Sequence, residues 1–263
     1  MSRSGLYSRR ALRKLRSKLV FDDGRSYGLK DKVTLSGSPE RFTFSGRRYQ
    51  VQVTAPPVVL LHKRFGTVTS HREGESVTVF DDLGALAVDG LEAVGRLDLD
   101  SEGVLLFTTD GQLLHRLTHP RYQVNRTYLV ALSRPPTMAL VERARAGQLD
   151  LNDGHTPHPT ALEPAEDATE HGLEPDQLGW RVTLTEGKYH EVRRLFAALD
   201  SHVERLIRID YAEVDLRGPS GERMEPGTAR RLGRGEVEAL YARVGLEVVR
   251  DQVELEGLGP VEA

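Results

Sequence analysis

The stretch GRLDLDSEGVLLFTTDG, residues 95–111, places charged side chains directly before an apolar run. Asp98, Asp100 and Glu102 precede the apolar residues 104–107, and Thr-Thr-Asp-Gly follows them. A short apolar run bounded by turn signals is typical of a buried strand, and Asp-Gly is itself a turn signal. The pattern predicts a turn rich in carboxylates that is held against a buried strand.

The composition allows one or two domains with a substantial core. The chain has 263 residues, of which 38% are hydrophobic, and this length is usual for one or two domains. It contains no cysteine, which excludes disulfides, thiolate nucleophiles and cysteine-ligated zinc. The N-terminus lacks the apolar segment of a secretory signal, and the most apolar stretch, residues 55–61, is too short to span a bilayer. We therefore expect a soluble, cytoplasmic protein with no membrane partner.

Charge is distributed unevenly, although the net charge is only −3. Residues 1–30 contain nine Lys and Arg residues and two acidic residues, whereas residues 150–176 contain eight acidic residues and no Lys or Arg. A polyanion would be attracted by the first segment and repelled by the second.

The front of the chain, residues 1–54, is predicted to form a small basic α+β module. Residues 8–19 place Leu at helical spacing among Arg and Lys, which predicts a basic helix, and residues 32–37 and 41–54 alternate like strands. The Ala55-Pro56-Pro57 segment is predicted to link this module to the rest of the chain.

Residues 55–250 are predicted to form an α+β domain with a mixed, largely antiparallel sheet, because strands are joined both by hairpins and by helices. Apolar or alternating segments predict strands near residues 58–70, 104–107, 126–132, 180–187 and 203–216. Apolar residues at helical spacing predict helices at 112–119, 137–147, 189–199 and 235–245. The final residues, 251–263, are predicted to be a frayed tail.

Several kinds of chemistry find no support. His115 and His119 would share a helix face, but no third metal ligand accompanies them at a familiar spacing. HEVRR at residues 190–194 begins like the zinc motif HExxH, yet Arg194 replaces the second histidine. The phosphate-binding patterns GxxxxGK[ST] and GxGxxG and the hydrolase pattern GxSxG do not occur. We expect no metal site.

Asp98 and Asp100 are the remaining candidates for chemistry. Residues two apart in an extended segment point the same way, and two carboxylates with different pKa values can act as acid and base. The alternative is that Asp98, Asp100 and Glu102 shape a turn and accept hydrogen bonds from neighbouring amides. Spacing alone favours this structural alternative.

Four blocks of sequence, in order, resemble the bacterial pseudouridine synthases of the ribosomal small-subunit synthase A type. The central block is VGRLDLDSEGVLLFTTDG. LLHKRFGTVTSHRE precedes it, with Lys63-Arg64-Phe65-Gly66 where Lys-Pro-x-Gly is more common. HRLTHPRYQVNRTYLVAL and TEGKYHEVRRLFAALDSHVERLIRI follow it. The resemblance covers residues 58–240 and implies the pseudouridine synthase fold.

The resemblance also implies a reaction. Pseudouridine formation breaks the N1–C1′ bond of a uridine, rotates the base and rejoins it through C5, so that no cofactor is needed. The resemblance assigns the role of reacting carboxylate to Asp98, which is expected to attack the sugar, to attack the base or to assist elimination to a glycal. Arg193 is expected beside it, because a neighbouring cation keeps a carboxylate ionised in a dry pocket. Tyr128 is expected to stack on the uracil ring and to help remove the C5 proton.

The same resemblance implies contacts with RNA. The target uridine must be flipped out of its stack, and Arg96 is expected to fill the vacated space, unless it forms a salt bridge with Asp100 or Glu102. Further substrate contacts are expected from Arg126, which stands where lysine is usual, and from Lys188 and Arg194.

The N-terminal module resembles part of an S4-type RNA-binding domain, which family members carry at this position. Residues 7–35 resemble its second half, but the usual opening helix is missing. A degenerate S4-like module is therefore expected to bind RNA through basic residues of the predicted helix, namely Arg9, Arg10, Arg13 and Lys14. In a later departure, Ala212 stands where the family has a glycine, which puts a local backbone turn in question.

The segments RYQVNRTYLV and EGKYHEVRRLFAAL resemble the small-subunit enzyme more than its large-subunit relatives. We predict a monomer that modifies one uridine of small-subunit (16S) ribosomal RNA, with large-subunit (23S) ribosomal RNA as the alternative. A non-catalytic ribosome-assembly factor that keeps the fold is a second possibility. A glycoside hydrolase with a carboxylate pair is a third, and it would need Asp100 as much as Asp98.

Overall fold

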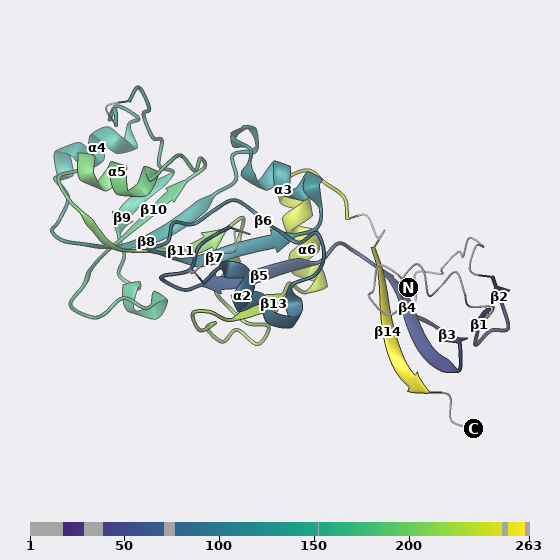
Figure 1. The fold of residues 1–263 in the computed structure, drawn as a ribbon. Helices are drawn as coiled ribbons and strands as arrows, with labels where there is room; N and C mark the ends of the chain where they lie inside the picture. The colour runs from purple at the N-terminus through teal and green to yellow at the C-terminus, as the bar shows by residue number, and fades with distance from the viewer. Residues whose placement is uncertain (1–17, 29–38, 71–76, 152, 249–251, 261–263) are drawn as a thin grey trace. The chain divides into compact units, whose positions relative to one another are not determined.

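The computed structural model describes residues 18–28, 39–70, 77–151, 153–248 and 252–260. The chain divides into a smaller unit, Met1–Pro56 with Val248–Ala263, and a larger unit, Pro57–Glu247 (Figure 1). The boundary between Pro56 and Pro57 falls within the segment predicted to be a linker. The basic helix predicted at residues 8–19 lies outside the described residues except for its last two positions, and there Leu19 begins a strand and not a helical turn.

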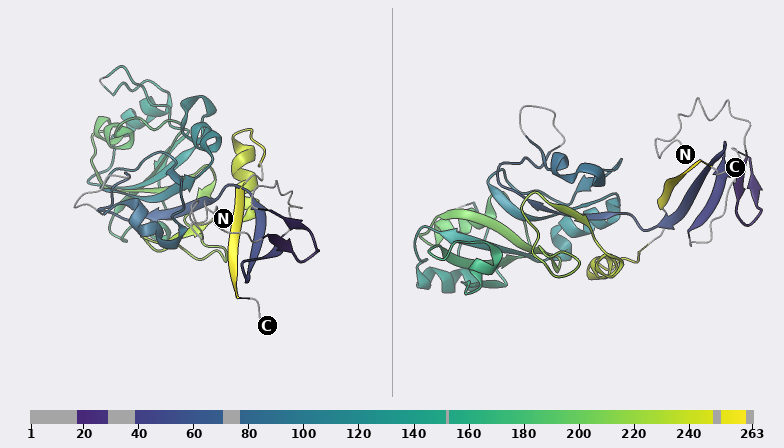
Figure 2. Two further views of the ribbon diagram at one scale, coloured as in Figure 1. Left: turned by 45° about the vertical axis from the view of Figure 1, so that its right-hand side comes forward. Right: turned by 90° about the horizontal axis from the view of Figure 1, so that it is seen from below.

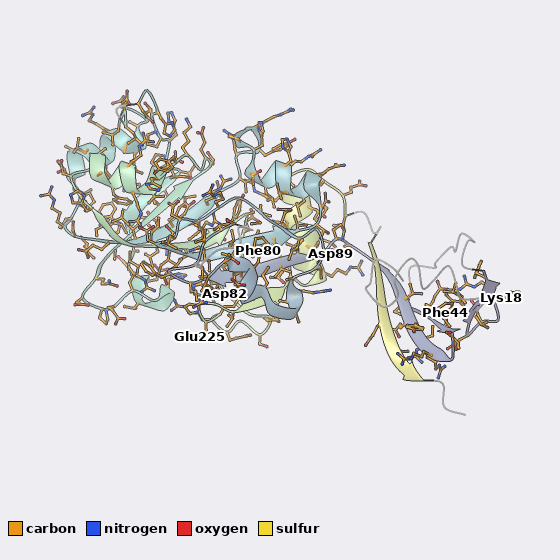
Figure 3. The ribbon with its side chains drawn as sticks, viewed as in Figure 1. Lys18, Phe44, Phe80, Asp82, Asp89 and Glu225 are labelled. Carbon is orange, nitrogen blue, oxygen red and sulfur yellow. The ribbon has the colours of Figure 1, made fainter. Side chains whose placement is uncertain are left out.

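The smaller unit contains a five-stranded antiparallel sheet in the order β14-β4-β3-β1-β2. Its strands are β1 (Leu19–Phe21), β2 (Ser26–Tyr27), β3 (Glu40–Phe44), β4 (Arg47–Thr54) and β14 (Gln252–Pro260). Because side chains alternate along a strand, one face of β3 and β4 buries Phe42, Phe44, Tyr49 and Val51 (Figure 3 labels Phe44). The Phe42 and Tyr49 rings stack with centroids 5.4 Å apart.

The prediction of a frayed tail is wrong for residues 252–260. They form β14, which pairs antiparallel with β4 from Gln252 opposite Thr54 to Pro260 opposite Arg47. Val253 and Leu255 alternate with glutamates, which is the pattern of a strand. The alternation is too short to predict a strand from the sequence alone. The pairing also satisfies the edge of β4, whose backbone groups would otherwise lie open.

The larger unit contains a nine-stranded sheet in the order β13-β5-β7-β11-β8-β10-β9, with β12 beside β11 and β6 beside β7. All its strand pairs are antiparallel except β7 with β11, which confirms the predicted mixed, largely antiparallel sheet. The strands are β5 (Val58–Lys63), β6 (Glu92–Ala93), β7 (Ser101–Thr108), β8 (Arg126–Leu132), β9 (Ala161–Pro164), β10 (Leu178–Leu184), β11 (Val203–Tyr211), β12 (Val214–Asp215) and β13 (Ala229–Arg231).

The helices of the larger unit are α2 (Val79–Leu83), α3 (Gly111–Thr118), α4 (Met138–Arg145), α5 (Glu191–Ala198) and α6 (Arg234–Arg243), with 3₁₀ turns at Gly84–Leu86, Pro120–Tyr122 and Ala168–His171. Both views of Figure 2 and Figure 1 show α4 and α5 together near β9 and β10. The Thr137 amide, which precedes α4, donates to the Leu199 carbonyl after α5 at 3.1 Å. α3 and α6 are joined by Tyr241 Oη, which donates to Asp110 at 2.7 Å.

The main core lies on one face of this sheet. Leu105, Phe107 and Trp180 from the strands pack there with side chains of α2, α4 and α5 such as Phe196, and Phe80 of α2 meets Phe107 edge-on at 5.5 Å (Figure 3). Each such buried side chain contributes about 1.5–3 kcal/mol of transfer free energy. No helix in the described part of the chain is both long and apolar enough to cross a bilayer.

The apolar run that follows the acidic turn becomes β7, an internal strand of the sheet between β5 and β11. All its residues are buried, and it lies parallel to β11 with Gly103 opposite Arg208. Gly103 has φ 111°, and a Cβ added there would lie 2.1 Å from the Arg208 carbonyl oxygen. The two strands approach this closely because residue 103 has no side chain.

Lys63, the last residue of β5, is fully buried and fixes the acidic turn. Its Nζ donates to the carbonyl oxygens of Ser101 at 2.7 Å, Arg64 at 3.2 Å and Leu99 at 3.5 Å. Burial lowers the pKa of Lys63 to about 8, although nearby carboxylates, Glu102 foremost, act in the opposite direction. The ammonium therefore ties the backbone of the turn to the end of β5.

Residue 212, where the family has a glycine, is an alanine with the positive φ angle that favours glycine. Ala212 and Glu213, with φ 55° and 68°, form the two-residue connection between β11 and β12, in which Tyr211 pairs with Val214. Such hairpins need positive φ at both central residues, and an alanine in this region costs about 1–2 kcal/mol.

Ala212→Gly is expected to raise the free energy of unfolding by about 0.5–1 kcal/mol, because glycine takes positive φ without a Cβ penalty. Urea unfolding of the purified variant measures the change. Ala139→Gly on the exposed side of α4 is the matched control and should lower the stability by about 1 kcal/mol. A loss of stability in both variants would contradict this account of the turn.

Lys63→Met is expected to change how stability depends on pH. The pKa of Lys63 is about 8 when folded and 10.5 in its ordinary range, so between these values the unfolded wild type binds more protons than the folded one. The free energy of unfolding of the wild type should therefore rise with pH relative to that of the variant, by about 3 kcal/mol in total. Denaturant curves of both proteins from pH 7 to 10.5 measure this, and parallel curves would contradict it.

Candidate active site

A cavity of about 520 Å³ opens in the larger unit between the acidic turn and the loop that precedes α5. Its walls are residues 94–98 and residues 186–193, and its floor is formed by residues of β8 and β11. Asp98, Tyr128 and Arg193, which the sequence predicts as the catalytic set, all line it, although they lie far apart in the chain. The topology brings them together because β8 and β11 are neighbours and β11 pairs with β7, the strand that follows Asp98.

Asp98 presents a half-exposed carboxylate at the mouth of this cavity. Its carbonyl accepts from the Ser101 amide at 3.1 Å, which closes the turn. Its Oδ2 lies 3.6 Å from Nε2 of His190, and its side chain is 41% exposed. His190 precedes α5 with a left-handed backbone, φ 48°, so the imidazole faces Asp98 from the opposite wall.

Arg193 does not pair with Asp98, contrary to the sequence-based expectation. Its Nη2 lies 2.8 Å from the Asp100 carboxylate and 3.2 Å from the Asp100 carbonyl oxygen, and its Nη1 donates to the Val203 carbonyl at 3.1 Å. The guanidinium reaches the turn from the first helical turn of α5, and Asp100 is the carboxylate that points outward toward it. Arg193 therefore fixes the backbone next to Asp98, and Asp100 does not line the cavity.

Tyr128 lies on the floor and is 8% exposed. On β8 it stands opposite Val182 of β10 and Arg208 of β11. Its ring is thus held on both sides by strands, and one surface of it remains open to the cavity. Such a position suits a ring that supports a flat base.

The predicted RNA-contacting residues are found in different environments. Arg96 is exposed at the rim and has no ion pair with any described residue. The two carboxylates considered as its partners bind other arginines: Asp100 binds Arg193, and Glu102 binds Arg205 at 2.7 Å.

Arg126 is buried at the floor, where its Nη groups donate to the Thr185 carbonyl at 2.9 Å and the Leu117 carbonyl at 3.2 Å.

Lys188 and Arg194 differ in their relation to the cavity. Lys188 lines it and bonds to Nδ1 of His155 at 2.8 Å. Arg194 does not line it, because its guanidinium is held by Asp153 at 2.5 Å outside the wall. Arg9, Arg10, Arg13 and Lys14 lie outside the described residues.

Sequence reasoning missed several cavity residues, among them Tyr189, His190 and Arg208. Tyr189 is 78% exposed, and its ring stacks on His190 at 3.9 Å; the Lys-Tyr-His run in a basic loop was the available signal. Arg208 is buried on the floor, and an arginine within the apolar alternation of residues 206–211 was the signal there.

The described residues contain one group of side chains with metal-ligand chemistry, namely His155, Glu186 and Glu191. Nε2 of His155 bonds to Glu191 at 2.7 Å, and Nζ of Lys188 reaches both Nδ1 of His155 at 2.8 Å and Glu186 at 3.4 Å. The Lys188 ammonium therefore contacts two members of this group, and the third, Glu191, is bonded to His155 and to the Lys188 backbone amide. His115 and His119 have ring centroids 5.0 Å apart and belong to no such group.

Comparison with known proteins agrees with this arrangement. The family model described as RNA pseudouridylate synthase matches residues 57–198. A curated protein named ribosomal small subunit pseudouridine synthase A from Vibrio vulnificus is 32% identical over 75% of this chain and 79% of its own length. The protein of the same name from Yersinia pestis is 32% identical over 88% of this chain and 91% of its own length.

Two further matches extend the comparison. A protein of Mycobacterium bovis, named as an uncharacterized RNA pseudouridine synthase, is 40% identical over 58% of this chain and 55% of its own length. A solved structure described as a pseudouridylate synthase superposes with a TM-score of 0.59 at 28% identity, over 91% of this chain and 96% of that one. The chain belongs to the RNA pseudouridylate synthase family and is an enzyme that converts uridine in RNA to pseudouridine.

Proposed function

We propose that this enzyme isomerises one uridine of small-subunit (16S) ribosomal RNA, as a cytoplasmic monomer, with Asp98 as the nucleophile. The observation that carries the proposal is the environment of Asp98. Its carboxylate lies at the mouth of the cavity and has no Lys or Arg partner among the described residues, whereas its two acidic neighbours are bound by arginines. Asp98 is thus the member of the acidic turn that is free to react.

The uridine reaches Asp98 by flipping out of the RNA, at a cost of a few kcal/mol. Tyr128 then supports the uracil ring from the floor. Arg96 is exposed at the rim, and it enters the space that the base has left. Tyr189 adds an exposed ring at the opposite rim, on which a flanking base can stack for about 1–3 kcal/mol.

The choice of the small subunit follows the names of the relatives that cover most of this chain, the Vibrio and Yersinia proteins. The mycobacterial protein is more similar over a shorter stretch, and its name gives no subunit. If the modified uridine is found in 23S ribosomal RNA, the proposed substrate is wrong and the proposed reaction still holds.

The smaller unit is proposed to be a degenerate S4-like module that adds affinity for RNA. In its described part, the β3–β4 hairpin exposes Arg41 and Arg47. Contacts of this kind are to phosphates and depend on salt, since each neutralised phosphate releases a counterion.

Asp98→Asn is expected to abolish pseudouridine formation, with a loss of at least about 10³-fold, because an amide cannot act as the nucleophile. Asp100→Asn is the matched control. It weakens an exposed ion pair with Arg193 worth about 0.2–1 kcal/mol and leaves the Asp100 carbonyl in place, so activity should stay within about tenfold.

The measurement is a pseudouridine map of ribosomal RNA from cells that lack the protein, rescued with wild type or with either variant. One 16S site restored by wild type and by Asp100→Asn, and not by Asp98→Asn, supports the proposal. Equal losses in both variants would favour a carboxylate pair. Full rescue by Asp98→Asn would favour a binding-only assembly factor.

A further inference from the structure

Two buried arginines at the cavity floor have no carboxylate partner among the described residues. Arg126 and Arg208 are 7% and 2% exposed, and both line the cavity. Burying a cation is costly unless a counter-charge or hydrogen bonds offset it. Arg208 keeps a buried donor without a partner among the described groups, which indicates that a negatively charged group comes to this floor during function.

A bulge in β11 puts these residues on one face. Arg208 stands opposite Tyr128, Asp210 opposite Thr127 and Tyr211 opposite Arg126, with a register shift between Arg208 and Asp210. Without the shift, Arg208 and Tyr211 would point to opposite faces, since they are three positions apart. Bulges re-aim side chains in this way and are frequent next to active sites.

The two guanidinium groups flank the Tyr211 ring. The Cζ atoms of Arg126 and Arg208 lie 4.9 Å and 4.8 Å from the ring centroid. Tyr211 Oη donates to the Leu117 carbonyl at 2.8 Å, and burial raises the pKa of Tyr211, so its hydroxyl stays neutral. The tyrosine therefore orients the cations and supplies no compensating negative charge.

Arg208 is held at one atom and open at another. Its Nε donates to the Val104 carbonyl at 2.7 Å, whereas its Nη2 is buried and has no hydrogen-bond partner among the described groups. Ser101 Oγ, on the same face of the neighbouring strand, is likewise buried without a partner. Arg126 differs, because its Nη groups are already bonded to carbonyls.

The group that reaches the floor is the base, because a flipped nucleotide enters base first and its phosphates stay at the rim. In the reaction of the proposed function, on which this inference rests, the C1′–N1 bond breaks and its electron pair goes to the uracil ring. C1′ bonds to the Asp98 carboxylate, and the departing uracil carries one negative charge, spread over O2 and O4. When C5 bonds to C1′, the bond to Asp98 breaks and the ring becomes neutral; the C5 proton then leaves to solvent and N1 takes one up, so that no net proton is consumed.

We propose that Arg208 is a catalytic residue whose Nη2 donates to a carbonyl oxygen of the uracil and whose charge stabilises the uracil anion. Ser101 Oγ provides a second donor to the ring. A preorganised donor aimed at developing charge acts mainly on the transition state. Arg208 thus supports the leaving base, while Asp98 acts at the mouth of the cavity.

Arg208→Gln is expected to lower kcat by about 10²–10³-fold, the usual effect of removing one such donor, with KM for the RNA within about threefold. Arg230→Gln is the matched control. Arg230 is also a partly buried strand arginine, but it is paired with Glu236 at 2.6 Å and does not line the cavity. Its kcat should stay within threefold of wild type. A kcat within threefold for a folded Arg208→Gln, or a loss confined to KM, would overturn the proposal.

A binding measurement tests Arg208 without turnover. Barbiturate has the ring of uracil and is an anion at neutral pH, so wild type should bind it at least tenfold more tightly than it binds uracil in calorimetric titrations. Arg208→Gln should lose this preference, and Arg208→Lys, which keeps the charge, should retain part of it if the glutamine variant fails to fold.

The two proposals fail in different ways. Equal affinity of wild type for barbiturate and uracil, or an unchanged preference in the folded Arg208→Gln variant, would overturn the role of Arg208. Wild type that leaves 16S ribosomal RNA unmodified would overturn the proposed substrate, while the barbiturate titration would still decide the role of Arg208.

Discussion

The buried ammonium of Lys63 is the interaction on which the position of Asp98, the proposed nucleophile, depends. It binds the carbonyls of Leu99 and Ser101, and Arg193 binds the carbonyl of Asp100 that lies between them. Three successive carbonyls of one turn are thus held by two cations that come from different sides. Asp98 is placed by its backbone and has no clamping side-chain partner, which leaves its carboxylate open at the mouth of the cavity.

The sign of the charged side chains in the cavity changes from the mouth to the floor. At the mouth lie Asp98 and His190, which are both partly exposed to solvent. At the floor lie Arg126 and Arg208, flanking a neutral tyrosine. In the proposed mechanism, a base that enters this cavity has its glycosidic bond nearer the carboxylate and its carbonyl oxygens nearer the cations. Low local dielectric strengthens both of these proposed interactions.

Much of this arrangement could be predicted from the sequence. The buried strand after the acidic turn, the helix that carries Arg193 and the meeting of Asp98, Tyr128 and Arg193 in one cavity all follow from periodicity and from the resemblance. The pairing of Arg193 could not be predicted, because the choice between Asp98 and Asp100 depends on which carboxylate the turn directs outward, a matter of a few backbone angles. Arg208 was missed because a register shift between Val203 and Arg205, and not a residue pattern, sets which face of β11 it occupies.

The strand prediction for the smaller unit is confirmed at residues 41–54 and wrong at the C-terminal end, and the strand predicted at residues 32–37 lies outside the described residues. β14 has the pattern of a strand, but its partner β4 ends nearly 200 residues earlier in the chain, and no local signal records so distant a pairing. The charge pattern of the sequence likewise does not show where each basic side chain points. Arg194 belongs to the same basic run as Arg193, yet one helical step turns it to the opposite side, where Asp153 holds it.

The pairing of β14 with β4 has a consequence for biosynthesis. The smaller unit is discontinuous, since its last strand is translated only after the whole of the larger unit. Until residues 252–260 have been synthesised, the edge of β4 has no strand beside it. The sheet that begins the chain can therefore be completed only after the whole segment of the larger unit has been translated.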